Sequence, residues 1–316
     1  MIVALHIPLE IRAGQLASLT MTEEEQKALD SLLHILNIEQ RDENHFHADT
    51  DQQEGRLFGG LILAQSVMAA GRTVAQGAAE GDIHSLHAYF LRAGKPVEPV
   101  DYMVERVRDG RTFTTRRVSA IQAGNMIFEA SISFTLGEEG IEHQTPMPPA
   151  PDPADLPTWW ESMRASMPPE MQAEMEKRGG RGRRGWNNPI DLRSVAGGRS
   201  AVDEHGLPHR VVWGRMPAAL PEDPLIHAAA MAYFSDSGLI ATVDGGRNMW
   251  RPGGSAASLD HAIWWHYPPR FDDWLLYSSY SPVAHAARAL VLGSMYNRGG
   301  VLVASVAQEG LYRASR

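Results

Sequence analysis

The sequence predicts an α+β protein built from two copies of one domain in tandem, each with an antiparallel sheet wrapped around a long helix. Three observations predict this architecture. Residues 57–79 and 224–243 are apolar on almost every side of a helix, which is typical of buried helices. β-rich segments separated by turn residues follow each of them. Matching segments of the two halves lie about 170 residues apart, as in a duplicated domain rather than a short-period repeat.

The composition excludes several classes of protein. At 316 residues the chain has room for two domains, and it contains no cysteine for disulfides, thiolate zinc sites or a cysteine nucleophile. The net charge of −9 argues against binding to nucleic acid. No apolar run is long enough to span a membrane, and the first residues do not resemble a signal peptide. We therefore expect a cytoplasmic protein that neither inserts into a membrane nor binds nucleic acid.

Changes in composition predict the domain boundaries. The expected units are a poorly defined extension at 1–21, an N-terminal domain at 22–144, a linker rich in proline, glycine and arginine at 145–185, and a C-terminal domain at 186–316. Met21 is an alternative start of the chain. Three glycines of the linker spell G-x-G-x-x-G, but neither the strand nor the helix of a dinucleotide site flanks them, so we discard that interpretation.

The elements of the first half follow from local signals. Thr22 and Glu25 form a capping box ahead of a helical stripe of leucines. The apolar helix at 57–79 contains no acidic residue. An Asp-Gly pair and a Gly-Asn pair separate the later β-rich runs and predict hairpins.

The second half repeats this plan. Asp223 and Pro224 predict the start of the helix at 224–243, because aspartate caps a helix and proline suits its first position. SLDHAIWWHYPP, which begins at Ser258, matches SLHAYFLRAGKP, which begins at Ser85. Residues 297–300 predict a hairpin turn before the last strand.

Asp236 is a single carboxylate within the second apolar helix, flanked by two serines. A buried carboxylate needs hydrogen bonds or a chemical role. The alternative is that a flanking serine marks the end of the helix, where Asp236 faces water. The residues alone leave both interpretations open.

Two other residues could join that carboxylate. In the last strand, residues 302, 304, 306 and 308 share a face, so Gln308 could reach the core beside Asp236 if that face meets the helix. Ser258 would open the first strand after the helix. A carboxylate, a hydroxyl and an amide can together hold and deprotonate one water. Taken separately, Gln308 could equally end a strand in solvent and Ser258 could be a turn residue.

Other chemistries have weaker support. No G-x-S-x-G elbow is present, so serine nucleophilic catalysis is not expected. The histidine pairs 45/47 and 84/87 have no third ligand nearby in the sequence, so we expect neither a metal nor a cofactor.

In order along the chain, the motifs resemble the acyl-CoA thioesterase II family, the double-hot-dog acyl-CoA hydrolases. The matching stretches are FGGLILAQS, HSLHAYFLRAG, VERVRDGRTFTTRRVSAIQAGNMIFEASISF, AYFSD, ASLDHAIWWH, WLLYSSYS and GVLVASVAQEGLYR. The resemblance implies a tandem hot-dog fold and hydrolysis of fatty acyl-CoA. It also implies that Asp236, Ser258 and Gln308 activate water, with Ser258 standing where the family usually has threonine.

The expected mechanism is direct attack of that water on the thioester carbonyl, with one catalytic site per chain. Backbone N–H groups near Gly59 and Gly60 would stabilise the oxyanion. Arg106, Arg111 and Arg117 belong to a run of arginines that could bind the phosphates of coenzyme A.

Two alternatives use the same fold. A non-catalytic acyl-CoA-binding sensor would have kept the site and lost turnover. An enoyl-CoA hydratase would need an aspartate and a histidine paired on the helix, whereas His227 lies nine residues from Asp236. The resemblance also implies a homo-oligomer, either a dimer or a tetramer.

Overall fold

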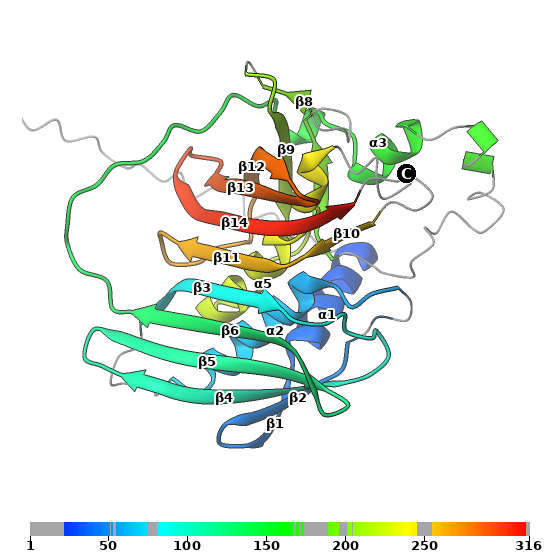
Figure 1. Cartoon of the computed structure of the whole chain (residues 1–316). Helices are drawn as coiled ribbons and strands as arrows, with labels where there is room; N and C mark the ends of the chain where they lie inside the picture. The colour runs from blue at the N-terminus through cyan, green and yellow to red at the C-terminus, as the bar shows by residue number, and fades with distance from the viewer. Residues whose placement is uncertain are drawn as a thin grey trace, which may run out of the picture.

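The structure is a computed structural model that describes residues 22–50, 52, 55–74, 81–166, 169–170, 172–173, 189–195, 201–203, 205–244 and 255–313. Within these ranges the strands form one antiparallel sheet, with the main helices on one of its faces (Figure 1). The helical elements are α1 (Glu23–Leu36), α2 (Gly59–Gly71), η1 (Pro153–Asp155), α3 (Trp159–Ser166), α5 (Pro224–Ser235) and η2 (Ile240–Val243). The strands of the first half are β1 (Glu39–Asp42), β2 (His45–Ala48), β3 (Asp82–Phe90), β4 (Val100–Asp109), β5 (Phe113–Gln122) and β6 (Asn125–Thr135). Those of the second half are β7 (Asp191–Ser194), β8 (Ala201–Val202), β9 (Pro208–Arg215), β10 (Ser255–Ser258), β11 (Asp260–Trp265), β12 (Leu275–His285), β13 (Arg288–Asn297) and β14 (Leu302–Arg313).

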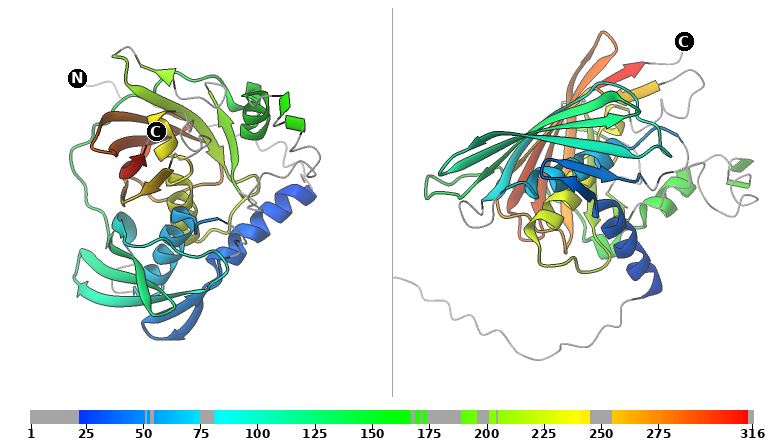
Figure 2. Two further views of the ribbon diagram at one scale, coloured as in Figure 1. Left: turned by 45° about the vertical axis from the view of Figure 1, so that its right-hand side comes forward. Right: turned by 90° about the horizontal axis from the view of Figure 1, so that it is seen from below.

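The two halves share one continuous sheet. Its strand order is β1-β2-β4-β5-β6-β3-β11-β14-β13-β12-β9-β7, with β10 paired to β14 and β8 to β9. The halves meet where β3 pairs with β11, from Ser85 opposite Trp264 to Tyr89 opposite Asp260. Figure 2 shows the sheet curving over the helices. The predicted plan, a sheet wrapped around a long helix in each half, is therefore confirmed.

The central helices α2 and α5 lie against each other beneath the sheet. Glycine makes this contact possible. A Cβ on Gly60 would lie 2.5 Å from the carbonyl oxygen of Tyr233, and one on Gly71 would lie 2.3 Å from Leu225 Cδ1. The two helices therefore run antiparallel at close distance, and the first turn of each lies beside the last turn of the other.

Both central helices are shorter than the sequence predicted. The first, predicted over 57–79, is α2 and ends at Gly71, where the Thr73 hydroxyl donates to the carbonyl oxygen of Ala70. The second, predicted over 224–243, is α5 and ends at Ser235. Beyond it the chain turns at Gly238, which has a φ of +75°, and continues as the 3₁₀ turn η2. Apolar composition predicted burial correctly but did not mark where the backbone leaves the helix.

The local start and turn signals are confirmed. The Thr22 hydroxyl and the Glu25 carboxylate form the reciprocal bonds of a capping box, and Asp223 caps α5 with Pro224 in its first turn. Hairpins join β4 to β5, β5 to β6 and β13 to β14. At the last of these, Asn297 accepts from the N–H of Gly300, whose φ is +81°.

The first part of the predicted linker packs on the outer face of the second half. Leu156 and Met147 contact a buried apolar cluster that contains Trp213 and Trp274. Just before the linker, the Gln144 amide bonds both to the carbonyl oxygen of Gly300 and to the N–H of Leu302. This stretch is therefore held against β9, β12 and β14 rather than crossing solvent as a tether.

Several predictions fall outside the described residues, among them the extension at 1–21, the start at Met21 and the three linker glycines that spell G-x-G-x-x-G. The exact domain boundaries stay predictions. In the part of the chain that the structure describes, no helix has the length and apolar character needed to cross a membrane.

Candidate active site

Asp236 lies directly after α5, as its C-terminal cap, with φ −89° and ψ −4°. Its residue is 9% exposed, so the carboxylate is buried even though the helix has ended. Each of the two interpretations from sequence was therefore half right. The helix does end at the flanking serine, but Asp236 points into the protein and not into water.

The other half of the chain supplies one partner of this carboxylate. The backbone N–H of Gly60, in the first turn of α2, donates to Asp236 Oδ2 at 2.9 Å. The free N–H groups and the positive end of the helix dipole favour a negative charge at this position. A Cβ on the neighbouring Gly59 would lie 2.6 Å from the same oxygen and 2.9 Å from the ring of Phe90. A side chain at position 59 would therefore displace the carboxylate or the Phe90 ring where the two copies meet.

Ser258 and Gln308 complete the predicted group. Ser258 ends β10 rather than opening the next strand, and its hydroxyl donates to Asp236 Oδ1 at 3.5 Å. Gln308 is fully buried on the inward face of β14, as the alternation predicted, and its Nε2 donates to Ser258 Oγ at 2.9 Å. The structure thus brings the predicted carboxylate, hydroxyl and amide together.

Two further residues contact this group and were not among the predicted site residues. The Nδ1 of His261 lies 2.6 Å from Gln308 Oε1, and its Nε2 lies 2.8 Å from the hydroxyl of Ser235. His261 is 1% exposed on the inward face of β11. The alternation of SLDHAIWW gave a usable signal, because it places Asp260 and His261 on opposite faces. Its pairing with Gln308 depends on the β11–β14 register, which the sequence does not give.

Burial controls the protonation of both ionisable groups. Desolvation raises the pKa of Asp236 to about 7, although hydrogen bonds from Gly60, Gln308 and Ser258 act in the opposite direction. Desolvation lowers the pKa of His261 to about 4, so this imidazole is neutral near pH 7. Asp236 therefore has the protonation behaviour of a general base working near neutral pH, and His261 does not.

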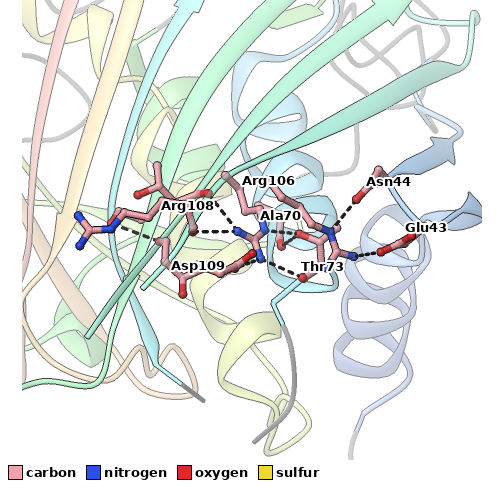
Figure 3. A network of polar contacts seen from close by, with 11 residues as sticks. Glu43, Asn44, Ala70, Thr73, Arg106, Arg108 and Asp109 are labelled. Carbon is pink, nitrogen blue, oxygen red and sulfur yellow. Dashed lines mark hydrogen bonds and ion pairs between the residues drawn. The ribbon is translucent and has the colours of Figure 1, made fainter. Parts of the chain in front are cut away.

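The predicted phosphate-binding arginines lie elsewhere. Arg106 on β4 pairs with Glu43 and Asn44, as Figure 3 shows, and Arg117 on β5 pairs with Glu105. Arg111 is exposed in the turn between these strands. Arg117 alternates with inward-facing residues and so lies on the outer face, and β6 and β3 separate β5 from β11. The structure does not bring these arginines to Asp236.

Arg116 of the same run is buried, with a side chain 1% exposed. Its guanidinium donates to the carbonyl and hydroxyl oxygens of Thr73, to Asp109 Oδ1, and to the carbonyl oxygens of Arg108 and Thr115. Thr73 and Asp109 are labelled in this cluster in Figure 3. Since a guanidinium has five N–H donors, its donors are fully used at the C-terminal end of α2. Arg116 therefore holds the fold and has no donor left for a phosphate.

His45, His47 and His227 each contact a structural partner. His45 and His47 both bind Asp101 Oδ1, at 2.9 Å each, on the outer face of β2 and β4. Among the described residues, no group of three His, Cys, Asp or Glu side chains could hold a metal ion. His227 accepts from the N–H of Phe271 with Nδ1. It lies in the first turn of α5, at the opposite end from Asp236, which argues against the hydratase arrangement.

The comparisons with known proteins point to one family. A family model described as the acyl-CoA thioesterase N-terminal domain matches residues 46–135, and one described as acyl-CoA thioesterase matches residues 197–311. Acyl-coenzyme A thioesterase 8 of Mus musculus is 35% identical over 287 residues, which cover 88% of each chain. Acyl-CoA thioesterase 2 of Haemophilus influenzae is 30% identical and covers 91% of this chain and 98% of its own.

Solved structures agree. An acyl-CoA thioesterase II from Mycobacterium marinum is 37% identical, with a TM-score of 0.73, and the match covers 90% of this chain and 97% of that one. A hot-dog protein from Alicyclobacillus acidocaldarius, 18% identical with a TM-score of 0.67, shares the fold. The fold is therefore a tandem hot-dog of the thioesterase class. The chain belongs to the acyl-CoA thioesterase family and is a thioester hydrolase, as the resemblance implied.

Proposed function

We propose that the chain hydrolyses fatty acyl-CoA to a free fatty acid and coenzyme A, with Asp236 as general base and Ser258 and Gln308 holding the water. The observation that carries this proposal is the buried Asp236 carboxylate, whose pKa is about 7 and whose neighbours are one hydroxyl and one amide. A carboxylate of that pKa is ionised often enough near pH 7 to accept a proton and basic enough to take it from water.

The steps balance without a cofactor. Asp236 takes a proton from water while the water oxygen bonds to the thioester carbonyl carbon, forming a tetrahedral oxyanion. When the oxyanion collapses, the carbon–sulfur bond breaks and the thiolate of coenzyme A takes the proton back from Asp236. The products are a carboxylic acid and a thiol, and Asp236 is again ionised.

The first turn of α2 supports both charges in this scheme. Because the N–H of Gly60 already donates to Asp236 Oδ2, the expected oxyanion donors near Gly59 and Gly60 need revision. We propose that the N–H of Gly60 binds the carboxylate. The oxyanion would then lie at the positive end of the same helix, where the other free N–H groups of the first turn can donate to it.

A free-thiol assay over short, medium and long acyl-CoAs tests the function. We expect turnover in the wild type and at least a hundredfold loss of kcat in Asp236→Asn, which cannot accept the proton; general-base steps contribute about 10²–10⁴-fold. Gly140→Ala is the matched control, because a Cβ there meets nothing within 4 Å. A fully active Asp236→Asn variant would contradict the assigned base. Binding of acyl-CoA without turnover by the wild type would favour the sensor.

Two other parts of the hypothesis concern the protein in the cell. We propose a cytoplasmic enzyme that assembles as a homo-oligomer, either a dimer or a tetramer, because hot-dog sheets commonly pair. Cell fractionation and light scattering on the purified protein test these points. A strict monomer would contradict the second.

A further inference from the structure

Gln308 is one of the three proposed catalytic residues. It contacts a fourth residue, which fixes the end of the Gln308 amide that faces Ser258. The inward face of β11 carries His261, and the pairing of Ala262 with Ala307 places His261 across from Gln308. The 2.6 Å contact between His261 Nδ1 and Gln308 Oε1 requires a proton between the two atoms. Because the amide oxygen cannot donate, the proton belongs to Nδ1.

This contact sets the direction of a chain of hydrogen bonds. The N–H of His261 donates to the oxygen of the Gln308 amide, whose nitrogen then donates to Ser258 Oγ at 2.9 Å. With that bond accepted, the Ser258 proton is directed to Asp236 Oδ1. Every donor in the chain points toward the carboxylate.

Ser235 contacts the other side of the ring and can accommodate this tautomer, but it does not select it. Its hydroxyl lies 2.8 Å from His261 Nε2 and 2.7 Å from the carbonyl oxygen of Ala232. A neutral imidazole with its proton on Nδ1 leaves Nε2 as an acceptor, and the Ser235 hydroxyl, which has one proton for two acceptors, donates to it only when it turns away from the Ala232 carbonyl oxygen. With the other tautomer, Nδ1 would face the amide oxygen lone pair to lone pair. Gln308 would then rotate and present its oxygen toward Ser258 and the carboxylate.

We propose that His261 is a positioning residue for the hydrolysis, which holds the Gln308 amide with its nitrogen toward Ser258 and Asp236. The inference rests on the proposed function, since it acts through Gln308 on the assigned base. His261 does not touch the reacting atoms. Its effect is to keep a donor, and not an acceptor, beside the carboxylate.

Substitutions at His261 can separate this role from simple packing. The amide nitrogen of asparagine falls close to the position of histidine Nδ1, and that of glutamine close to Nε2. His261→Asn therefore retains a donor for Gln308, whereas His261→Gln retains only the contact with Ser235. His261→Leu retains neither.

We expect His261→Leu and His261→Gln to lower kcat about tenfold, the upper end of the usual effect of one hydrogen bond between neutral groups, with KM changed less than twofold. His261→Asn should recover most of kcat. The acid limb of the pH profile should move to higher pH in His261→Leu, because Gln308 stops donating to Asp236. Two other ionisable groups lie close to this end of α5, where Tyr277 donates to the carbonyl oxygen of Ser235 and Arg210 donates to that of Ser237. Their pKa values lie above the range of this measurement.

A double-variant cycle decides the mechanism. If His261 acts through Gln308, His261→Leu has no further effect in a Gln308→Ala background. The same loss in both backgrounds, or an His261→Asn variant no better than His261→Leu, would overturn the proposal. If His261→Leu does not fold, the comparison of His261→Asn with His261→Gln carries the test, and equal kcat values in these two variants also overturn the proposal. An active Asp236→Asn variant would instead refute the proposed base.

Discussion

The carboxylate of Asp236, at the end of α5, accepts a hydrogen bond at 2.9 Å from the backbone N–H of Gly60, in the first turn of α2. The two residues belong to different copies of the duplicated domain. Only the second copy carries the acid, and the first copy contributes the helix N-terminus that faces it. The first copy therefore contributes to the proposed site, and because only the second copy carries the acid, we expect one site per chain.

This relationship predicts the effect of Gly59→Ala. The new Cβ would lie 2.6 Å from Asp236 Oδ2, so the carboxylate must shift. A displacement of about 1 Å at a catalytic group costs about a hundredfold in rate. We expect kcat to fall by that order while the melting temperature changes little, measured by the thiol assay and by thermal unfolding. Retention of full kcat would show that the carboxylate tolerates the shift.

The raised pKa of Asp236 predicts the pH dependence of hydrolysis. The carboxylate must be ionised to accept a proton, so kcat/KM should fall with decreasing pH below a midpoint near 7. Ser258→Ala removes a hydrogen bond that lowers this pKa and should move the midpoint upward. A wild-type midpoint near 4 would mean that the carboxylate is solvated and not buried.

The same pKa predicts that the carboxylate of Asp236, the proposed base, destabilises the fold. The folded-state pKa of Asp236, about 7, lies above its ordinary value of 3.8, so the folded protein binds the proton more tightly than the unfolded chain. The protonated carboxyl group therefore makes its full contribution to the stability of the fold below pH 4, and this contribution is lost as the pH rises to 7. Asp236→Asn should therefore stabilise the protein at pH 8, by up to about 4 kcal/mol, and much less at pH 4.5. Urea unfolding at the two pH values measures this, and an equal difference at both would contradict it.

The sequence was sufficient for the fold and for three members of the candidate site. Alternation along β14 places Gln308 inward, and the repeat structure identifies α5 and the strands that cover it. It was not sufficient for features that depend on register or on contacts between helices. The Gly60 contact needs α2 packed closely on α5, and the His261 contact needs the pairing of β11 with β14.

The arginines show a second limit of sequence reasoning. A run of basic residues on two strands indicates a possible phosphate site, but charge alone does not show what each guanidinium contacts. Across β4 and β5, Arg117 lies opposite Glu105, while Arg116 turns inward. The sequence shows that acidic residues lie on the neighbouring strand, but only the register of the two strands tells which arginine each of them pairs with.

Arg116 gives the last prediction, which concerns stability alone. Arg116→Met leaves the carbonyl oxygens of Thr73 and Arg108 without this donor and should cost about 2–4 kcal/mol of unfolding free energy. Arg106→Met is the matched control, since Arg106 pairs with exposed Glu43 at the surface and such a pair contributes at most about 1 kcal/mol.

Arg116 holds the C-terminal end of α2, whereas Asp236 lies at its N-terminal end. With 13 residues in the helix, the two ends are about 20 Å apart. The folded fraction of Arg116→Met should therefore keep the kcat of the wild type, and a large loss of kcat with unchanged stability would contradict this structural role.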